Sequence, residues 1–161
     1  IYHTLPPAPS PRMSNARPQI HIDQVGTFQR IATEHFGTDL YECVRPNPTG
    51  APLRLVTVPT GDTISSALAN RVRTTFRIVA LAHRQMMARI EPRLRQLMHQ
   101  MRLTPPDNLL QRAESMSLAE IFVCDPSGIS ITYAGHPLLR GARLNAELDA
   151  DARPFELWIG G

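Results

Sequence analysis

Arginine side chains recur at helical intervals between residues 63 and 102, and a guanidinium group is well suited to bidentate contacts with phosphates and carboxylates. This stretch holds one acid, Glu91, and eight arginines. Such a concentration of positive charge attracts acidic proteins or polyanions. The candidate basic face consists of Arg71, Arg73, Arg77, Arg84, Arg89, Arg93 and Arg95.

The same arginines could instead be neutralised within the chain. The segment after Arg102 carries eight acids against four arginines, so internal charge pairing is available. The two interpretations differ at Arg73, Arg77, Arg84 and Arg95, which either stay free or pair with these acids. A nucleic-acid surface is the less favoured partner surface, because Phe76 is the one aromatic residue in the stretch and the net charge is only +3.

Gly135 and His136 form a second candidate site. Glycine allows a close backbone approach, and the histidine could fix the adjacent hairpin by a hydrogen bond to the backbone. A role in acid–base catalysis would need a partner, for which Asp125 and Glu120 are the nearest candidates. The structural role is the favoured interpretation.

The sequence contains no recognised catalytic motif, phosphate-binding loop or metal-ligand spacing. Cys43 and Cys124 are far apart, and each lies in an apolar run that suits a buried thiol. We therefore expect no catalytic residue, no metal ligand and no cofactor. No apolar run is long enough to span a membrane, and a cytoplasmic location is expected.

The element that must position the basic face is a long helix over residues 63–102. Its apolar residues recur at steps of three and four, which predicts one buried face. Pro92 interrupts the run, so the pattern predicts either one kinked helix or two helices that break near Glu91. Thr104-Pro105-Pro106 ends it.

The rest of the chain reads as short strands and two further helices. Helices are expected at residues 27–36 and 106–115, and strands at residues 19–22, 40–44, 53–58, 118–124, 129–133, 138–148 and 155–159. The turn at residues 125–128 makes the clearest hairpin. Together these elements predict an α+β domain whose mostly antiparallel sheet packs on the long helix.

Residues 1–18 hold five prolines and little that could be buried, so they predict an extended arm before a single domain of residues 19–161. Met13 could be the native start, with residues 1–12 as a leader. An ordered arm would lie against its own domain or a neighbouring copy and support self-association, with Ile1, Tyr2 and Leu5 as anchors.

The C-terminal third follows the order strand, turn, strand, aromatic, Gly-His, apolar strand, acidic turn and final strand. The residues that carry this order are Gly128, Tyr133, Gly135, His136, Leu138, Asp149, Asp151 and Gly160. It resembles a group of small bacterial domains of unknown function, whose members are often similar to immunity and accessory proteins that accompany toxins. The chain departs from that group at Ala134, where a second aromatic is usual, and in being basic.

Three functions follow from these features. The favoured one, which the resemblance implies, is a non-enzymatic protein-interaction module, immunity-like or accessory to a toxin or secretion system. Its partner would be a protein, acidic if the arginines bind it. The alternative is an anion or nucleic-acid binder that uses the same arginines, and the third is an enzyme centred on His136.

Overall fold

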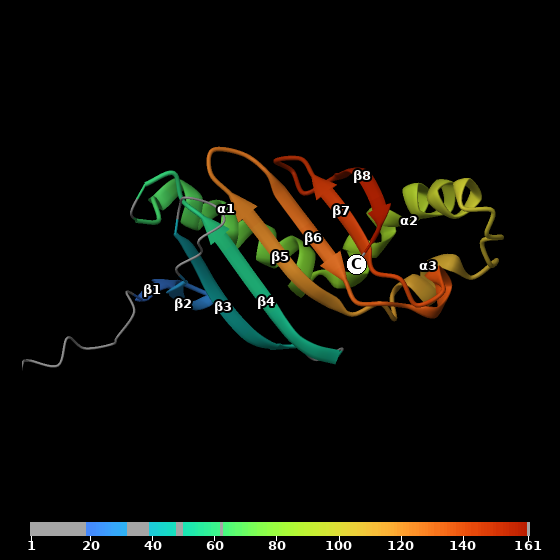
Figure 1. Cartoon of the computed structure of the whole chain (residues 1–161), viewed down its shortest axis with the longest axis horizontal. Helices are drawn as coiled ribbons and strands as arrows, with labels where there is room; N and C mark the ends of the chain where they lie inside the picture. Colours follow the sequence, from blue (N-terminus) through green and yellow to red (C-terminus); the bar gives the residue numbers. More distant parts are fainter. Residues whose placement is uncertain (1–18, 32–38, 48–49, 62, 161) are drawn as a thin grey trace, which may run out of the picture.

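The computed structural model describes residues 19–31, 39–47, 50–61 and 63–160. It contains one eight-stranded sheet whose strands lie side by side in their sequence order, from β1 to β8. In Figure 1 the helical stretch from α1 into α2 runs behind this sheet, and the end of α2 and α3 extend beyond its β8 edge. The predicted α+β class, with a mostly antiparallel sheet packed on helices, is confirmed. The predicted arm, residues 1–18, lies outside the described residues.

The strands are β1 (Gln19–Ile22), β2 (Gly26–Ile31), β3 (Leu40–Asn47), β4 (Gly50–Val58), β5 (Leu118–Cys124), β6 (Ile129–Tyr133), β7 (Leu144–Leu148) and β8 (Pro154–Ile159). The helical segments are α1 (Ser66–Phe76), the π-helical turn η1 (Arg77–Leu81), α2 (His83–Gln100), α3 (Leu109–Ala113) and the 3-10 turn η2 (Pro137–Leu139). All neighbouring strands are antiparallel except β4 and β5, which are parallel. The helical segments from α1 to α3 form the crossover that a parallel pair requires.

The core lies between one face of the sheet and the helices. A continuous cross-strand row of Leu55, Ile121, Ile131 and Ala146 is buried on this face. The helices contribute the buried side chains Leu68, Val72, Phe76, Val79, Met86, Met87, Ile90, Leu94 and Met98. The three- and four-residue spacing of these positions is the periodicity that predicts the long helix.

The helical stretch breaks at Ala82, and the predicted break near Glu91 is wrong. Ser65 caps the N-terminus of α1, where its hydroxyl accepts a hydrogen bond from the Leu68 N–H at 3.1 Å. At the break, the Ala82 N–H donates to the Arg77 carbonyl five residues earlier, as in a π-helix. Pro92 lies inside α2 on an exposed side, so its missing hydrogen bond affects a carbonyl that solvent can reach.

Two further sequence expectations are wrong. Gly26–Ile31, inside the expected helix at residues 27–36, is strand β2, because Phe28 and Ile20 pair across the sheet and Phe28 is buried there; residues 32–38 lie outside the described residues. The expected strand at residues 138–148 begins as η2 and becomes β7 only at Leu144. Arg140 and Gly141 separate the two, because both have positive φ angles that a strand cannot hold.

Candidate interaction surfaces

Three predicted arginines bind backbone carbonyls at the ends of C-terminal strands. The Arg71 Nη1 donates to the Cys124 and Pro126 carbonyls at 2.7 and 3.1 Å. The Arg89 Nη1 donates to the Asp151 carbonyl at 3.0 Å, and the Arg93 Nη1 donates to the Phe155 carbonyl at 2.9 Å. These guanidinium groups fasten α1 and α2 to the far half of the sheet.

Three more arginines have polar partners within the chain, of different kinds. The Arg73 Nε donates to the Asp23 carbonyl at 3.1 Å, and Arg95 pairs with Glu91 of its own helix at 2.7 Å. Arg84 reaches one of the C-terminal acids, Glu114, at 3.3 Å. Most of these arginines therefore form hydrogen bonds to backbone carbonyls and not ion pairs with C-terminal acids.

Arg77 and Arg84 are the most available of the seven predicted residues. Arg77 is exposed, and its side chain has no hydrogen bond or ion pair within the residues that the structure describes. The Arg84 side chain is 84 % exposed despite its contact with Glu114. The basic face is thus divided into arginines that hold the fold together and this smaller exposed pair.

His136 caps the η2 turn, and it also contacts Ser115. The Leu138 N–H donates to the His136 Nδ1 at 3.1 Å, while the His136 Nε2 lies 2.8 Å from the Ser115 Oγ. Because Nδ1 accepts, the ring proton of the neutral imidazole is on Nε2 and is donated to Ser115. The Ser115 hydroxyl in turn donates to the Arg112 carbonyl at 2.6 Å. In this arrangement the histidine cannot withdraw the serine proton, so the pair is not an activated nucleophile.

The residues around His136 also bear on its predicted role. Glu120 pairs with Arg54, and Asp125 accepts a hydrogen bond from Thr60, so the structure places neither acid with His136. Gly135 lies against the turn that follows: a Cβ atom built on it would be 2.3 Å from the Gly141 carbonyl oxygen. Burial and the charge of Arg112 lower the pKa of His136, which favours the neutral ring.

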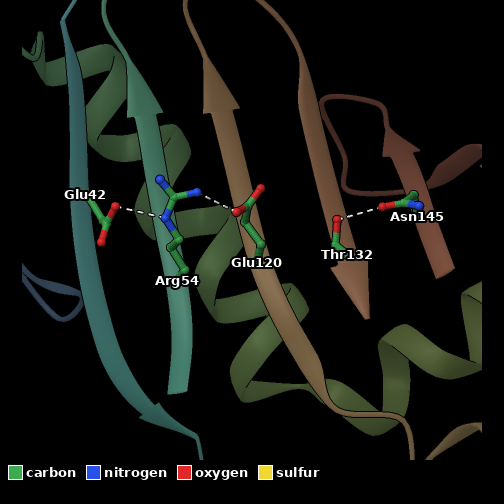
Figure 2. Close-up of polar contacts among 5 residues, drawn as sticks. All are labelled: Glu42, Arg54, Glu120, Thr132 and Asn145. Atoms are coloured by element: carbon green, nitrogen blue, oxygen red, sulfur yellow. Dashed lines mark hydrogen bonds and ion pairs between the residues drawn. The ribbon is translucent and has the colours of Figure 1, made fainter. Parts of the chain in front are cut away.

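A surface that the sequence analysis missed lies on the side of the sheet away from α1 and α2, here called the helix-free face. Figure 2 shows Arg54 on β4 between Glu42 on β3 and Glu120 on β5. The Arg54 Nε is 2.9 Å from Glu42 Oε2, and its Nη1 is 2.8 Å from Glu120 Oε2. Burial alone would lower the pKa of Arg54, but the hydrogen bonds to both carboxylates outweigh it and raise the pKa.

Six side chains form one row across the helix-free face, from β3 to β8. The strand register places Val44, Arg54, Glu120, Thr132, Asn145 and Trp158 next to one another in this order. The Thr132 hydroxyl donates to Asn145 Oδ1 at 2.8 Å (Figure 2). Both ends of the row are apolar and exposed, with Val44 at 59 % and Trp158 at 38 %. The polar side chains in the middle of the row are therefore paired with one another, whereas the apolar side chains at its two ends remain exposed.

A neighbouring row on the same face ends in two like charges. Phe122 pairs with Ser130, Ser130 with Glu147, and Glu147 with Glu156. Neither glutamate has a hydrogen bond or ion pair within the described ranges of the chain. Burial, and then the charge of Glu156, raise the pKa of Glu147. Directly opposed like charges destabilise a strand pair. A cation bound between the two carboxylates would therefore stabilise this edge of the face.

The sequence indicates that the polar residues of this surface lie on half-exposed strands, but it does not indicate that they contact one another. Glu42, Arg54 and Glu120 each alternate with apolar neighbours along their strands, which is the pattern of a half-exposed strand. Their mutual contact depends on the parallel pairing of β4 with β5, which joins Arg54 to a residue 66 positions away. Local spacing does not reveal that pairing.

Other chemistry has little support among the described residues. Both cysteines are free, and burial is the main cause that raises the pKa of each thiol. In this part of the chain, no three side chains of His, Cys, Asp or Glu gather as metal ligands would. No helix that the structure describes is both long enough and apolar enough to cross a membrane.

Comparison with known proteins leaves the chain without a match: no family model, no curated protein and no solved structure is detectably similar to it.

Proposed function

We propose that the chain is a non-enzymatic protein-interaction module that binds its partner through the helix-free face of the sheet. The observation that supports this most is the row from Val44 to Trp158, which spans six strands and has exposed apolar residues at both ends. Neighbouring strands lie about 4.8 Å apart, so six strands cover roughly 24 Å, the scale of a protein interface. Exposed tryptophan and a central arginine are both enriched at such interfaces.

The charge of the face indicates the chemistry of the partner. Arg54 is already held by Glu42 and Glu120, whereas Glu147 and Glu156 form no ion pair among the described residues. A partner with lysine or arginine at this position would relieve their repulsion and gain charge-assisted hydrogen bonds. We therefore propose a protein partner that is basic where it meets β7 and β8.

The sequence resemblance supports a more specific role. The group that the chain resembles is often similar to immunity and accessory proteins that accompany toxins, so we propose that the partner is a toxin or another secreted protein that accompanies this chain. We place the complex in the cytoplasm, where the free thiols of Cys43 and Cys124 would stay reduced.

The test compares partner binding by four chains: the wild type, the double variant Glu147→Gln/Glu156→Gln, the variant Trp158→Ala and the control Asp107→Asn. Asp107 is an exposed acid outside the sheet. Candidate partners are identified by quantitative affinity purification from the source organism and then purified. Calorimetry should show weaker binding by the double variant and by Trp158→Ala, with the control unchanged. Equal affinities for all four chains would overturn the proposal.

A second candidate function, anion binding by the helices, is favoured by one observation. Arg77 and Arg84 are exposed, and they leave positive charge available to an acidic protein or a polyanion. A DNA duplex should then bind at low salt and lose affinity steeply as salt rises, because bound phosphates release counterions. Arg77→Gln/Arg84→Gln should abolish this binding and Arg143→Gln should not. A flat salt response would remove this function.

Self-association through the N-terminal arm remains a prediction, because residues 1–18 lie outside the described residues. Deletion of residues 1–12 should change the elution volume in size-exclusion chromatography and leave the domain folded. Unfolding of the shortened chain would instead place the arm in the core.

A further inference from the structure

A cavity of about 460 Å³ lies on the helix side of the sheet, beside the break between α1 and α2. Its apolar lining includes Leu53 on β4, Leu118 on β5 and Phe76 at the end of α1. Arg45 on β3 and His83 at the start of α2 supply polar groups. Volumes between 300 and 1,000 Å³, with mostly apolar walls and a few polar groups, are typical of sites for small molecules.

The π-helical turn η1 accounts for the shape of this cavity. Its wide turn places Ala80, a small side chain, in the wall and leaves Leu81 at the rim with 68 % of its surface exposed. The helical period alone would favour a regular helix here, and π-helical turns are frequent at functional sites. A bound molecule would cover Leu81, which the described part of the fold leaves in solvent.

Arg45 has the free donors that an anion needs. Its guanidinium lies 4.7 Å from the centre of the Phe76 ring. Its Nη1 donates to the Val25 carbonyl and, at 3.4 Å, to the Gln24 carbonyl. Within the described residues no carboxylate pairs with Arg45, and its Nε and Nη2 donate to no acceptor. These two nitrogens form the side of a guanidinium that binds a carboxylate with two parallel hydrogen bonds.

We propose that this cavity binds a small organic acid with an apolar body. The carboxylate pairs with the Nε and Nη2 of Arg45, and the apolar body lies against Phe76, Leu53 and Leu118. The cavity is on the opposite side of the sheet from the helix-free face, so this inference is independent of the proposed function.

Medium-chain compounds that share one apolar chain test the proposal on the full-length protein. Decanoate, decanol and decylamine are titrated separately in a calorimeter, below their micellar concentrations. Decanoate should bind at least about tenfold more tightly than decanol, because a charge-assisted bidentate contact is roughly twice as strong as a neutral one. Decylamine should bind least, because its charge repels that of Arg45. Equal binding of decanoate and decanol, or no heat with decanoate, would overturn the proposal.

Two variants locate the binding. Ala80→Leu fills the cavity and should abolish decanoate binding, whereas Ala88→Leu, at an exposed position of α2, should not. Arg45→Met removes the guanidinium group, keeps an unbranched side chain and should remove the preference for decanoate over decanol, with the exposed Arg143→Met as control. Circular dichroism checks that each variant is folded. Unchanged decanoate binding by Ala80→Leu would place the acid elsewhere and refute the site.

Failure here is distinguishable from failure of the proposed function. Glu147→Gln/Glu156→Gln should keep decanoate binding while it loses the protein partner, and Ala80→Leu should do the reverse.

Discussion

Glu147 lies directly opposite Glu156 across β7 and β8, and neither carboxylate forms an ion pair in the described part of the chain. Burial and the charge of Glu156 raise the pKa of Glu147. Two like charges that face each other across neighbouring strands lower the stability of the fold. Such a loss of stability is common where a surface serves binding. The relationship leads to the first prediction.

Glu147→Gln should stabilise the fold at neutral pH by roughly 0.2–1 kcal/mol, because it removes a cross-strand repulsion. A raised pKa means that the folded chain binds this proton more tightly than the unfolded chain. The stability that protonated Glu147 contributes is therefore complete below its ordinary value of 4.5 and is lost as the pH rises through the folded pKa. Urea titrations at pH 4 and pH 7 should show a difference between variant and wild type only at pH 7. A variant that is less stable at both pH values would contradict the repulsion.

Arg54 should be energetically coupled to both of its carboxylate partners. Its side chain is 44 % exposed, so each ion pair is screened and should contribute roughly 0.2–1 kcal/mol. A double-mutant cycle of Arg54→Met with Glu120→Gln, measured by chemical denaturation, should give a coupling energy in this range. Arg54→Met with Asp107→Asn supplies the matched cycle, which should give none. Equal coupling in both cycles would show that only the net charge matters.

His136→Ala should lower the free energy of unfolding by about 0.5–2 kcal/mol, the usual cost of losing a side-chain cap. The lowered pKa of His136 also gives the wild type a pH dependence. The unfolded chain binds this proton more tightly, so stability is complete above its ordinary value of 6.5 and falls as the pH drops through the folded pKa. Melting temperatures at pH 5 and pH 7.5 measure this loss, which His136→Asn should reduce while it keeps a side-chain acceptor. An unchanged melting temperature in His136→Ala would remove the structural role.

Gly135→Ala should destabilise the fold by roughly 1–3 kcal/mol, because the added methyl group would lie 2.3 Å from the Gly141 carbonyl oxygen. Gly61 provides the control, because a Cβ there would meet no atom of the described residues within 4 Å. Gly61→Ala should be neutral or stabilising, since it lowers the entropy of the unfolded chain. Thermal unfolding of both variants measures the contrast, and a tolerated Gly135→Ala would mean that the turn yields.

The sequence predicts those elements whose signals are local. The hairpin of β5 and β6 agrees with its predicted bounds, because Ile121, Val123, Ile129 and Ile131 alternate with polar or half-exposed residues around a turn. Residues 27–36 are predicted as a helix, because Phe28 and Ile31 are three positions apart, a spacing that places them on one helix face, whereas in strand β2 they lie on opposite faces of the sheet. Pairing with β1 and β3 decides for the strand.

The candidate surfaces depend more on contacts between distant residues. Helical spacing identifies the arginines of α1 and α2, but it cannot show that Arg71, Arg89 and Arg93 bind backbone carbonyls of another element. The cavity depends on a π-helical turn, and the apolar period continues in phase through it from Phe76 to Met86. Pro92 predicts a break near residue 91, but it lies inside α2. The observed break is at Ala82, where the sequence has no proline or glycine to predict it.

The parallel pairing of β4 and β5 divides the molecule into two meanders, each built from hairpins between consecutive strands. Within each meander every pairing is local in sequence, and the parallel seam is the only strand pairing of the described sheet that must close a long loop. Loop closure is entropically costly, and non-local pairings slow folding. The seam should therefore form last. A chain cut between Val58 and Leu118 would give two fragments with intact hairpins, whose reassembly would depend on this one seam and on the helices that cross it.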